Sequence, residues 1–471
     1  MPLPLYVDLD GSLSRTDTLH EMTILLLSKN LLYIVLLPIW LSKGIANLKQ
    51  QISFRVDLDV ANLPYDKRVV DIVHQARQNK SRTILLTAAD QSVADSVSSH
   101  LGLFDSAIGS NGTTNMKGDR KLDFILSDSN SGFEYVGNSK EDVAILQKAA
   151  NGYFISGHKG LIRQLKNRAC GKINFLEDTT NSLRAVRKSL RLHQWIKNSL
   201  VFVPILLDHQ LMHLATLTSG LLAFLSFSLC ASAIYLLNDL LDVRDDRKHS
   251  SKRHRPIAAG ELTVSRAVAL LFLLLGLSGV LASLLPMGFA ITLGAYVVIT
   301  TAYSARLKRV PVLDVLILAG LFTTRILAGK SAAGIENSFW LLSFGMFVFL
   351  SLALVKRYSE LEKIDPAQIK QMPGRGYKPE DLDLLSQVGT SSACMAVLVL
   401  ALYINSPEVK QMYSHPEAIW LLCPLMLYVL IRVWLLTRRG VIDDDPVIFI
   451  LNDSRSLVAA ALAFAILWIA A

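Results

Sequence analysis

Hydrophobic positions divide the 471-residue chain into two parts with different patterns. Up to about residue 180, short apolar runs alternate with amphipathic stretches and polar loops. Beyond residue 199, apolar runs of near membrane-spanning length dominate, and charged residues collect between them. The pattern predicts an α/β domain at 1–180, a basic interfacial linker at 181–198, and an all-α membrane domain at 199–471.

The front part shows the alternation of strands and helices that is typical of a parallel sheet. Leu3 to Val7, Arg82 to Leu86 and Phe133 to Val136 are predicted to be buried strands. Helical patterns lie between them, at Asp66 to Gln78 and Ser92 to His100. Polar residues follow each strand, so we expect them to meet at the carboxyl edge of the sheet.

An unusual insert separates the first two strands. Ile24 to Trp40 is apolar except for Ser28, Lys29 and Asn30, and it contains Pro38. The run is short for a transmembrane span and carries a central charge. We therefore expect a helical cap that lies on the bilayer surface.

The rear part contains about nine apolar segments. They are Ser199–Leu207, Leu214–Leu237, Ala267–Leu285, Phe289–Tyr303, Val312–Ala328, Phe339–Val355, Val388–Tyr403, Ile419–Leu436 and Leu457–Ala470. Basic residues concentrate in the loops after the second, fourth, sixth and eighth segments, which predicts that these loops are cytoplasmic. With nine spans the front domain is then cytoplasmic too. We expect an integral protein of a bacterial inner or plasma membrane.

Composition supports a membrane protein and excludes other classes. Hydrophobic residues make up 51% of the chain and charged residues 18%. The net charge is +9, but the basic residues lie in loops between apolar runs, so they indicate topology and phosphate binding and exclude nucleic-acid binding. The four cysteines form no CxxC pair, and no cleavable signal peptide is expected at the N-terminus.

The stretch from Asn238 to Pro256 carries the densest candidate chemistry. If the preceding helix continues, Asp239, Asp242 and Asp246 fall at i, i+3 and i+7 on one face. Stacked carboxylates suit Mg²⁺, which usually takes phosphate oxygens as further ligands. Six basic residues follow closely: Arg244, Arg247, Lys248, Lys252, Arg253 and Arg255. The pattern indicates a diphosphate site, and the alternative is an ordinary cytoplasmic loop with solvated acids.

The same residues resemble a known motif. Asn238-Asp239-x-x-Asp242-x-x-x-Asp246, followed by Lys252-x-x-Arg255-Pro256 and Gly260, resembles the first aspartate-rich motif of the UbiA superfamily of intramembrane prenyltransferases. The resemblance implies that the three aspartates hold Mg²⁺ on a diphosphate, with Asn238 as a neutral oxygen ligand. It further implies that Lys252, Arg255 and Lys308 neutralise the departing pyrophosphate.

Further motifs narrow the resemblance to one branch. Tyr303-Ser304-x-x-Leu307-Lys308, Asp314 and Arg325 are similar to a later region of the same superfamily, and Arg325 lies deep in an apolar run. Such a charge is usually functional, and the alternative is an ion pair with Asp314 for packing alone. Substrate-binding residues are expected in a second set: Lys356, Arg357, Tyr358, Glu360, Arg375 and Tyr377. These KRYSEL and RGY stretches, without a second DxxxD motif, resemble polyprenyl-phosphate phosphoribosyltransferases. The acidic run 443–445 with Asp453 completes that resemblance.

The front domain resembles a second family. Asp8-x-Asp10-Gly-Ser, Thr87, Lys121 and Gly137-Asn138-x-x-x-Asp142 are similar to the haloacid-dehalogenase-like phosphohydrolases. The resemblance implies that Asp8 is the nucleophile, that Asp10 is the general acid and base, that Thr87 holds a phosphate oxygen, and that Lys121 offsets negative charge. Asp8, Asp10 and Asp142 would hold Mg²⁺. The chain departs from the family at Asn138, where aspartate is usual. A domain retained only for binding or folding is the alternative.

Together these patterns predict a Mg²⁺-dependent membrane transferase with a fused phosphatase. The expected substrates are phosphoribosyl pyrophosphate and a polyprenyl phosphate. The protein is expected to lie in the membrane bilayer. One alternative is a prenyltransferase that alkylates an aromatic acceptor. Another is a non-catalytic membrane lipid-binding protein. The sequence gives no indication of oligomeric state or isoprenoid length.

Overall fold

The computed structural model describes residues 2–129, 131–156, 159–168, 171–176, 182–335, 339–363, 375–407, 409, 413–442 and 445–470. The chain forms two compact units. Unit 1 contains Met1–Arg191 and Tyr235–Phe272, and unit 2 contains Leu192–Ile234 and Leu273–Ala471. Each unit is described by itself.

Unit 1 is built on a six-stranded sheet of order β3-β2-β1-β4-β5-β6, in which every pairing is parallel. The strands are β1 (Leu5–Val7), β2 (Thr83–Asp90), β3 (Ser106–Ser110), β4 (Glu134–Gly137), β5 (Asn151–Ile155) and β6 (Lys172–Leu176). Tyr6 of β1 pairs with Ile84 of β2 and Tyr135 of β4. The predicted parallel sheet is confirmed, and β1 lies near its centre.

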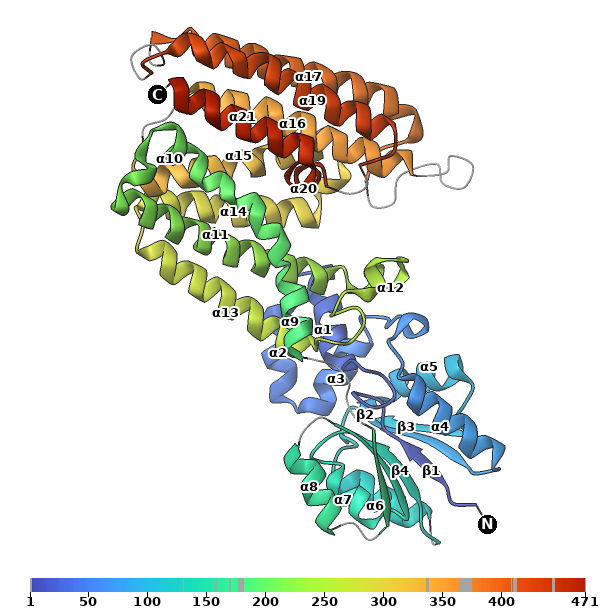
Figure 1. Cartoon of the computed structure of the whole chain (residues 1–471). Coiled ribbons are helices and arrows are strands. Elements are labelled where there is room, and N and C mark those ends of the chain that lie inside the picture. Colours follow the sequence, from blue (N-terminus) through green and yellow to red (C-terminus); the bar gives the residue numbers. More distant parts are fainter. Residues whose placement is uncertain are drawn as a thin grey trace. The chain divides into compact units, whose positions relative to one another are not determined.

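Helices cover both faces of this sheet (Figure 1). They include α4 (Lys67–Gln78), α5 (Gln91–Leu101), α6 (Asp119–Asp128), α7 (Val143–Lys148) and α8 (Lys159–Arg168). Alternate residues of a strand enter different cores, because Leu5 and Val7 join one hydrophobic cluster and Tyr6 joins another. Both faces are therefore buried, as parallel strands require.

The insert between β1 and β2 is helical, as predicted. It consists of α1 (Thr18–Lys29), α2 (Tyr33–Ser42) and α3 (Ile45–Ser53). The side chain of Asp17 accepts a hydrogen bond from the backbone N of His20 and thereby caps α1. None of the three helices is long enough to cross a bilayer.

The remainder of unit 1 surrounds the aspartate-rich stretch. It includes α9 (Ser182–Leu190), which occupies part of the predicted linker, then α12 (Val243–Lys248) and the turn η4 (Lys252–His254). Two long helices, α11 (Leu214–Leu241) and α13 (Val264–Ser283), each contribute residues to both units.

The described residues of the membrane part form helices joined by loops. Seven described helical segments are long and apolar enough to span a membrane. Five are the helices α11, α13, α14 (Met287–Ala305), α15 (Leu313–Ala333) and α16 (Phe339–Glu362). The other two are α17 (Leu382–Ile404) and α19 (Leu422–Arg438), each extended by a preceding 3₁₀ helix to give Pro379–Ile404 and Pro416–Arg438. An eighth span arises if α20 (Pro446–Asn452) and α21 (Ser454–Ala470), bent by 77°, count as one. The predicted first segment instead forms the end of the 3₁₀ helix η2 (Leu192–Phe202) and the five-residue helix α10 (Val203–Leu207). The described residues thus give seven or eight spans, where about nine were expected.

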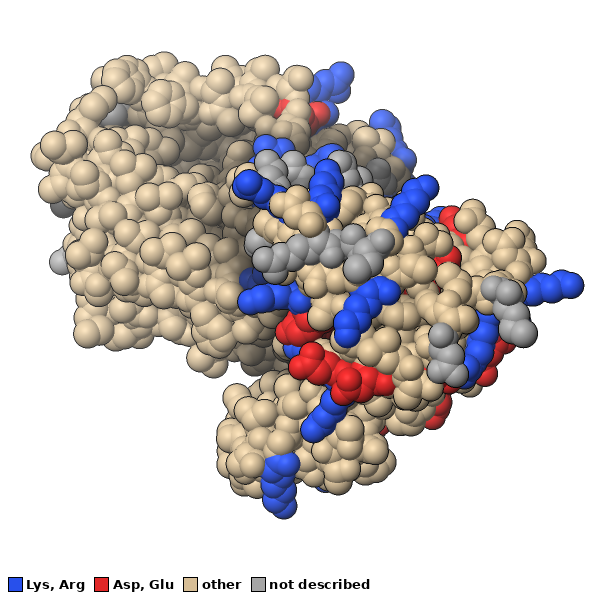
Figure 2. Space-filling view, turned by 90° about the horizontal axis from the view of Figure 1, so that it is seen from below, with Lys and Arg blue, Asp and Glu red and all other residues tan. Residues whose placement is uncertain are grey.

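Buried polar side chains in unit 2 are paired between helices. Trp434 Nε1 of α19 donates to Ser351 Oγ of α16 at 3.0 Å, and Ser351 Oγ donates to the carbonyl of Gly389 of α17 at 2.8 Å. A Cβ at Gly389 would lie 1.9 Å from the Trp434 ring, so only glycine permits this approach. Figure 2 shows a broad uncharged area on the visible face, which is consistent with the long apolar helices.

Candidate active sites

The first candidate site lies at the carboxyl edge of the sheet in unit 1. Asp8 follows β1, Thr87 lies near the end of β2, and Asn138 follows β4. Because these three strands are neighbours and parallel, their ends meet at one edge. The structure therefore brings together the residues that the sequence placed after separate strands.

A buried charge network links this edge to α6. Lys121 Nζ lies 2.5 Å from Asp8 Oδ1 and 4.0 Å from Asp142 Oδ1. Tyr135 Oη donates to Asp142 Oδ1 at 2.7 Å, and the other Asp142 oxygen accepts hydrogen bonds from Ser139 N and Oγ at 2.9 and 2.6 Å. The network fixes Asp142 firmly, and Lys121 engages Asp8 through its Oδ1 atom. Tyr135 and Ser139 were not predicted, because neither belongs to the quoted motif.

Burial raises the pKa of two carboxyl groups at this site, Asp8 and Asp10. Burial raises the pKa of Asp8 to about 6, with Lys121 opposing the rise and Asp142 adding to it. Burial also raises the pKa of Asp10 to about 7, assisted by Asp17, although Asp10 Oδ1 accepts a hydrogen bond from Thr18 N at 2.8 Å. A carboxyl group with this pKa can hold a proton or release it near neutrality, as a general acid and base must.

Two further features shape the cleft. Gly11 has φ of +77°, and a Cβ there would lie 2.0 Å from Asn138 Nδ2, so the amide of Asn138 packs directly on the glycine. Lys49 of α3 donates to the carbonyl of Ala88 at 2.5 Å and to Asn115 Oδ1 at 2.9 Å. The helical insert therefore contributes a cation beside Thr87 that sequence reasoning missed.

The second candidate site is the aspartate-rich stretch of unit 1. Although α11 ends at Leu241 and α12 begins at Val243, the helical bonds continue from Asp242 N to Asn238 O and from Asp246 N to Asp242 O, both 2.8 Å. The predicted spacing on one face is confirmed for two of the acids. Arg255 Nη1 contacts Asp239 Oδ1 at 3.1 Å and Asp246 Oδ2 at 2.7 Å.

A second arginine, not predicted from the sequence, completes this cluster. Arg191 Nη2 lies 2.5 Å from Asp239 Oδ1, and its guanidinium stacks 4.9 Å from the centre of the Tyr235 ring. Burial raises the pKa of Asp246, which Arg255 opposes. Both Asp239 and Asp246 are almost fully buried. The two carboxylates are therefore held by guanidinium groups, while Lys252 lies exposed in η4.

The donor atoms of this stretch fit a hard divalent cation. Asn238 Oδ1 is buried and accepts no hydrogen bond from any residue that the structure describes. An orphaned amide oxygen beside carboxylates matches the all-oxygen preference of Mg²⁺. Within the described ranges, no three acidic, histidine or cysteine side chains are gathered as a metal site. The metal-ligand assignments at both candidate sites therefore stay predictions.

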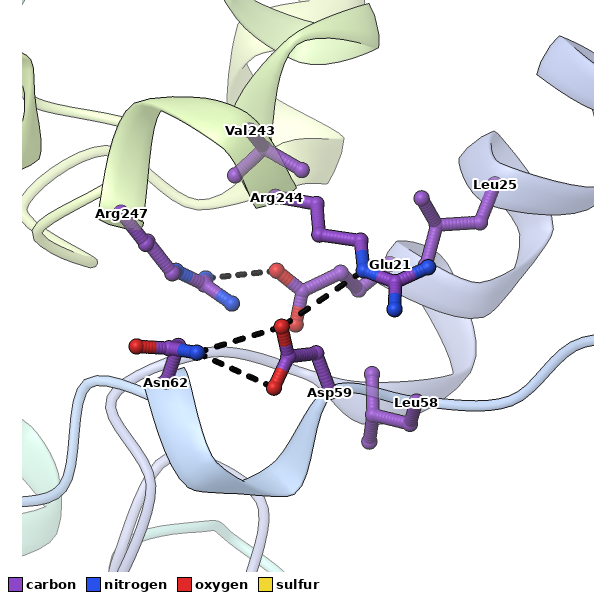
Figure 3. Close-up of a pocket in the computed structure, with 8 residues that line it drawn as sticks. All are labelled: Glu21, Leu25, Leu58, Asp59, Asn62, Val243, Arg244 and Arg247. Carbon is purple, nitrogen blue, oxygen red and sulfur yellow. Dashed lines mark hydrogen bonds and ion pairs between the residues drawn. The ribbon is translucent and has the colours of Figure 1, made fainter. Parts of the chain in front are cut away.

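The aspartate-rich stretch is also joined to the helical insert by ion pairs (Figure 3). Arg247 Nη2 of α12 lies 2.5 Å from Glu21 Oε1 of α1, and both side chains are buried. Asp59 contacts Arg244 at 3.5 Å and Lys248 at 3.0 Å. Arg247 Nε also donates to the carbonyl of Ala258 at 3.0 Å, which closes the loop between α12 and α13. Glu21 thus supports the segment that carries Asp242 and Asp246.

The third candidate site surrounds Asp314 in unit 2. This carboxylate is fully buried, and its Oδ2 lies 2.7 Å from Arg357 Nε and 3.7 Å from Arg375 Nη1. Its Oδ1 accepts a hydrogen bond from Tyr377 Oη at 2.5 Å. Arg375 also donates to Tyr303 Oη at 3.0 Å, and Glu360 pairs with Arg357 and Arg375. Five predicted substrate-binding residues therefore gather around one aspartate: Tyr303, Arg357, Glu360, Arg375 and Tyr377.

Other predicted residues lie elsewhere in unit 2. Arg325 does not pair with Asp314, so that alternative is wrong. Its Nε donates to Asn198 Oδ1 at 2.9 Å, and three aromatic rings lie within 5.4 Å of its guanidinium carbon. Tyr358 packs edge-on against Trp434. Lys197, which was not predicted, pairs with Asp445. Asp443 and Asp444 lie outside the described residues.

Three more predicted site residues, Lys308, Lys356 and Thr87, have defined places in the fold. Lys308 lies in the turn η5 (Leu307–Arg309), and Lys356 lies on α16, one residue before Arg357. Thr87 is fully buried, and its hydroxyl accepts a hydrogen bond from Ala89 N at 3.0 Å. The roles of these side chains stay predictions.

Comparison with known proteins identifies the membrane domain. A model described as the UbiA prenyltransferase family matches residues 205–452. An uncharacterized protein, y4nM of Sinorhizobium fredii, is 36% identical over 466 residues, which is 98% of this chain and 89% of the relative. The decaprenyl-phosphate phosphoribosyltransferase of Corynebacterium glutamicum is 40% identical over 178 residues, 37% of this chain and 54% of the relative. The chain thus spans about half of that enzyme.

The solved structures show a weaker likeness. The structure of a UbiA homolog from Archaeoglobus fulgidus bound to GPP and Mg²⁺ is 22% identical, covers 61% of this chain and 100% of the homolog, and has a TM-score of 0.46. The family model covers more than half of the 471 residues, and the near full-length relative exceeds 30% identity. The chain belongs to the UbiA prenyltransferase family.

Proposed function

We propose that the chain is a Mg²⁺-dependent transferase that moves the 5-phosphoribosyl group of phosphoribosyl pyrophosphate to a polyprenyl phosphate. One observation carries the proposal: buried Asp239 and Asp246 share the guanidinium of Arg255, next to the orphaned oxygen of Asn238. Acids for a cation beside bases for phosphate are what a diphosphate substrate requires. The similarity to decaprenyl-phosphate phosphoribosyltransferase supports the choice of donor and acceptor.

The reaction exchanges one bond at the anomeric carbon. An oxygen of the lipid phosphate forms a bond to that carbon as its bond to pyrophosphate breaks, and pyrophosphate leaves with the electron pair. Mg²⁺, held by Asp239, Asp242, Asp246 and Asn238, would offset the charge of the diphosphate. Arg255, Arg191 and Lys252 would stabilise the negative charge that grows on the leaving group.

The cluster around Asp314 has a separate role in this proposal. Asp314 holds Arg357 and Arg375 in place, and Arg375 also engages the hydroxyl of Tyr303. Guanidinium groups fixed by a buried carboxylate form a preorganised binding surface for phosphate oxygens. We assign this cluster to recognition of a substrate phosphate group.

We further propose that the front domain is a phosphatase acting on the transferase product. Asp8 Oδ2 would attack the phosphorus of the 5-phosphate, and Asp10 would give its proton to the leaving ribose oxygen. Water would then hydrolyse the aspartyl phosphate. The pKa of Asp10, raised to about 7, favours this role. Lys121 would offset the charge on Asp8 and the phosphoryl group.

Transfer of label from phosphoribosyl pyrophosphate tests the first proposal. Purified protein in detergent is incubated with Mg²⁺, the labelled donor and a polyprenyl phosphate, and the organic phase is counted. We expect label in lipid with the wild type and with Asp245→Asn, an exposed neighbour, but not with Asp239→Ala. Label that stays in water with the wild type would refute the donor assignment. Equal activity of Asp239→Ala would favour a non-catalytic role for the motif.

The product of the same assay tests the phosphatase. The wild type should release the 5-phosphate from the lipid product, while Asp8→Asn should accumulate the phosphorylated lipid. The exposed Asp71 on α4 provides a matched control, because Asp71→Asn makes the same chemical change away from the cleft. A dephosphorylated product from Asp8→Asn would refute the proposed phosphatase.

The alternative of prenyl transfer is favoured by the description of the family itself. It predicts that label moves from a prenyl diphosphate to an aromatic acceptor. The same preparations and variants distinguish the two reactions when the labelled donor is changed.

A further inference from the structure

The helix α2 of the insert buries only one narrow stripe. Tyr33, Leu37 and Trp40 lie at i, i+4 and i+7 and pack against the core of unit 1. The rings of Tyr33 and Trp40 are 6.1 Å apart, and Arg55 lies 4.7 Å from the centre of the Trp40 ring. These contacts fix the orientation of α2, so its other side chains point away from the core.

That outward surface is apolar and strongly exposed. The exposed fractions are 74% for Leu31, 73% for Leu32, 59% for Ile34, 63% for Val35, 49% for Ile39 and 52% for Leu41. The helix itself contains no charged residue. A continuous apolar surface of this kind is unfavourable in water and marks a contact with another apolar phase.

The charges around the surface indicate which phase that is. Residues 22–56 include no acidic residue and four basic ones: Lys29, Lys43, Lys49 and Arg55. Lys29 and Lys43 lie exposed at the two ends of α2, where long basic side chains can reach lipid phosphates while the helix lies in the acyl boundary. At ten residues, α2 is about 15 Å long and cannot span the bilayer.

We propose that α2, with Leu31 and Leu32, inserts into the headgroup boundary of an anionic bilayer and holds the α/β domain against the membrane surface. The bilayer is the chosen occupant because the described residues of the same chain include seven or eight membrane spans, so the insert is always tethered close to lipid. The basic rim without acids matches an anionic surface, whereas a second copy of the same basic rim would repel it.

This contact would also bring the proposed phosphatase to its substrate. The insert carries Lys49, which lies at the carboxyl edge of the sheet beside Thr87. A lipid-linked phosphate would then reach the cleft without leaving the membrane. This consequence rests on the proposed phosphatase, but the lipid contact does not depend on either chemistry.

Depth-dependent fluorescence quenching tests the contact in the full chain. Val35→Cys, in a background without the four native cysteines, is labelled with an environment-sensitive dye and placed in nanodiscs of anionic lipid. Spin-labelled acyl chains should quench the dye at least several-fold more than at the matched control Ser99→Cys. Ser99 is exposed on α5, which lies apart from α2 in Figure 1. Equal, weak quenching at both positions would overturn the proposal.

A second measurement tests the same contact without removing the native cysteines, in case the cysteine-free chain does not fold. A photoreactive phenylalanine at position 35 of the otherwise native chain should form adducts with lipid that mass spectrometry detects. Adducts with a second copy of the chain, or with its own membrane helices, would overturn the proposal. If the lipid adduct forms and dephosphorylation is absent, the contact stands and the proposed phosphatase fails.

Discussion

The ion pair between Glu21 and Arg247 makes a quantitative prediction. Glu21 is only 1% exposed, and Arg247 Nη2 at 2.5 Å is its charged partner. Arg247→Met keeps most of the side-chain volume but removes that partner. The buried carboxyl group would then take up a proton, because burial already raises the pKa of Glu21 and Arg247 opposes this rise.

The cost of this protonation depends on pH. Holding a proton at pH 7 on a group that ionises near pH 4.3 when unfolded costs about 3.7 kcal/mol, and about 1.6 kcal/mol at pH 5.5. The folded variant binds the proton and the unfolded chain releases it, so stability falls as pH rises above about 4.3. For a folding unit of this size, the cost at pH 7 corresponds to a fall in melting temperature of roughly 7–15 °C.

Thermal unfolding in detergent at pH 5.5, 7 and 8 measures this effect. The double variant Glu21→Gln/Arg247→Met is the control, because neither of the two replaced side chains carries a charge at any pH. We expect the single variant to lose melting temperature relative to the double variant as pH rises. A difference that does not change with pH, or a double variant as unstable as the single one, would refute the reasoning.

Three further predictions concern the candidate sites. Arg255→Met should lower the initial rate of transfer by about 10²–10³-fold, because two carboxylates lose the cation that they share. Arg253→Met, which changes an exposed neighbour, should leave that rate unchanged. Tyr377→Phe should cost about 1–3 kcal/mol of stability, measured by thermal unfolding, because the buried Asp314 loses a hydrogen bond; an unchanged melting temperature would contradict this. Gly11→Ala should abolish hydrolysis of a soluble aryl phosphate, since its Cβ would lie 2.0 Å from Asn138 Nδ2. Gly276→Ala, at a helical position with open space around it, should retain activity.

The sequence predicted the centre of the sheet better than its edges. The strands β1, β2 and β4 were expected, because each contains a run of buried apolar residues (Leu5–Val7, Ile84–Leu86 and Tyr135–Val136), as a central parallel strand requires. The strands β3, β5 and β6 were missed. The residues of the outer strands β3 and β6 are mostly half-buried, and the sequences SAIGS, NGYFI and KINFL all mix polar or glycine positions with apolar ones. Such short mixed runs do not differ from loops in pattern alone.

The candidate sites show the same limit. Helical periodicity was enough to predict that Asp239 and Asp246 share a face, because both lie on one segment. The partner Arg191, 48 residues from Asp239, depends on tertiary packing and carries no local signal. Sequence reasoning could, however, have excluded the pair of Asp314 and Arg325. Eleven residues along one helix correspond to a rise of about 16 Å, which is too far for an ion pair.

The central claim concerns what the aspartate-rich stretch binds, and a competition between donors tests it most directly. Wild-type protein in nanodiscs receives Mg²⁺, phosphoribosyl pyrophosphate, a polyprenyl phosphate, a prenyl diphosphate and an aromatic acceptor together. Mass spectrometry then identifies the lipid product. We predict a polyprenyl phosphate that carries ribose or ribose 5-phosphate, absent with Asp239→Ala and present with Asp245→Asn. A prenylated aromatic product, with the polyprenyl phosphate unchanged, would contradict the claim.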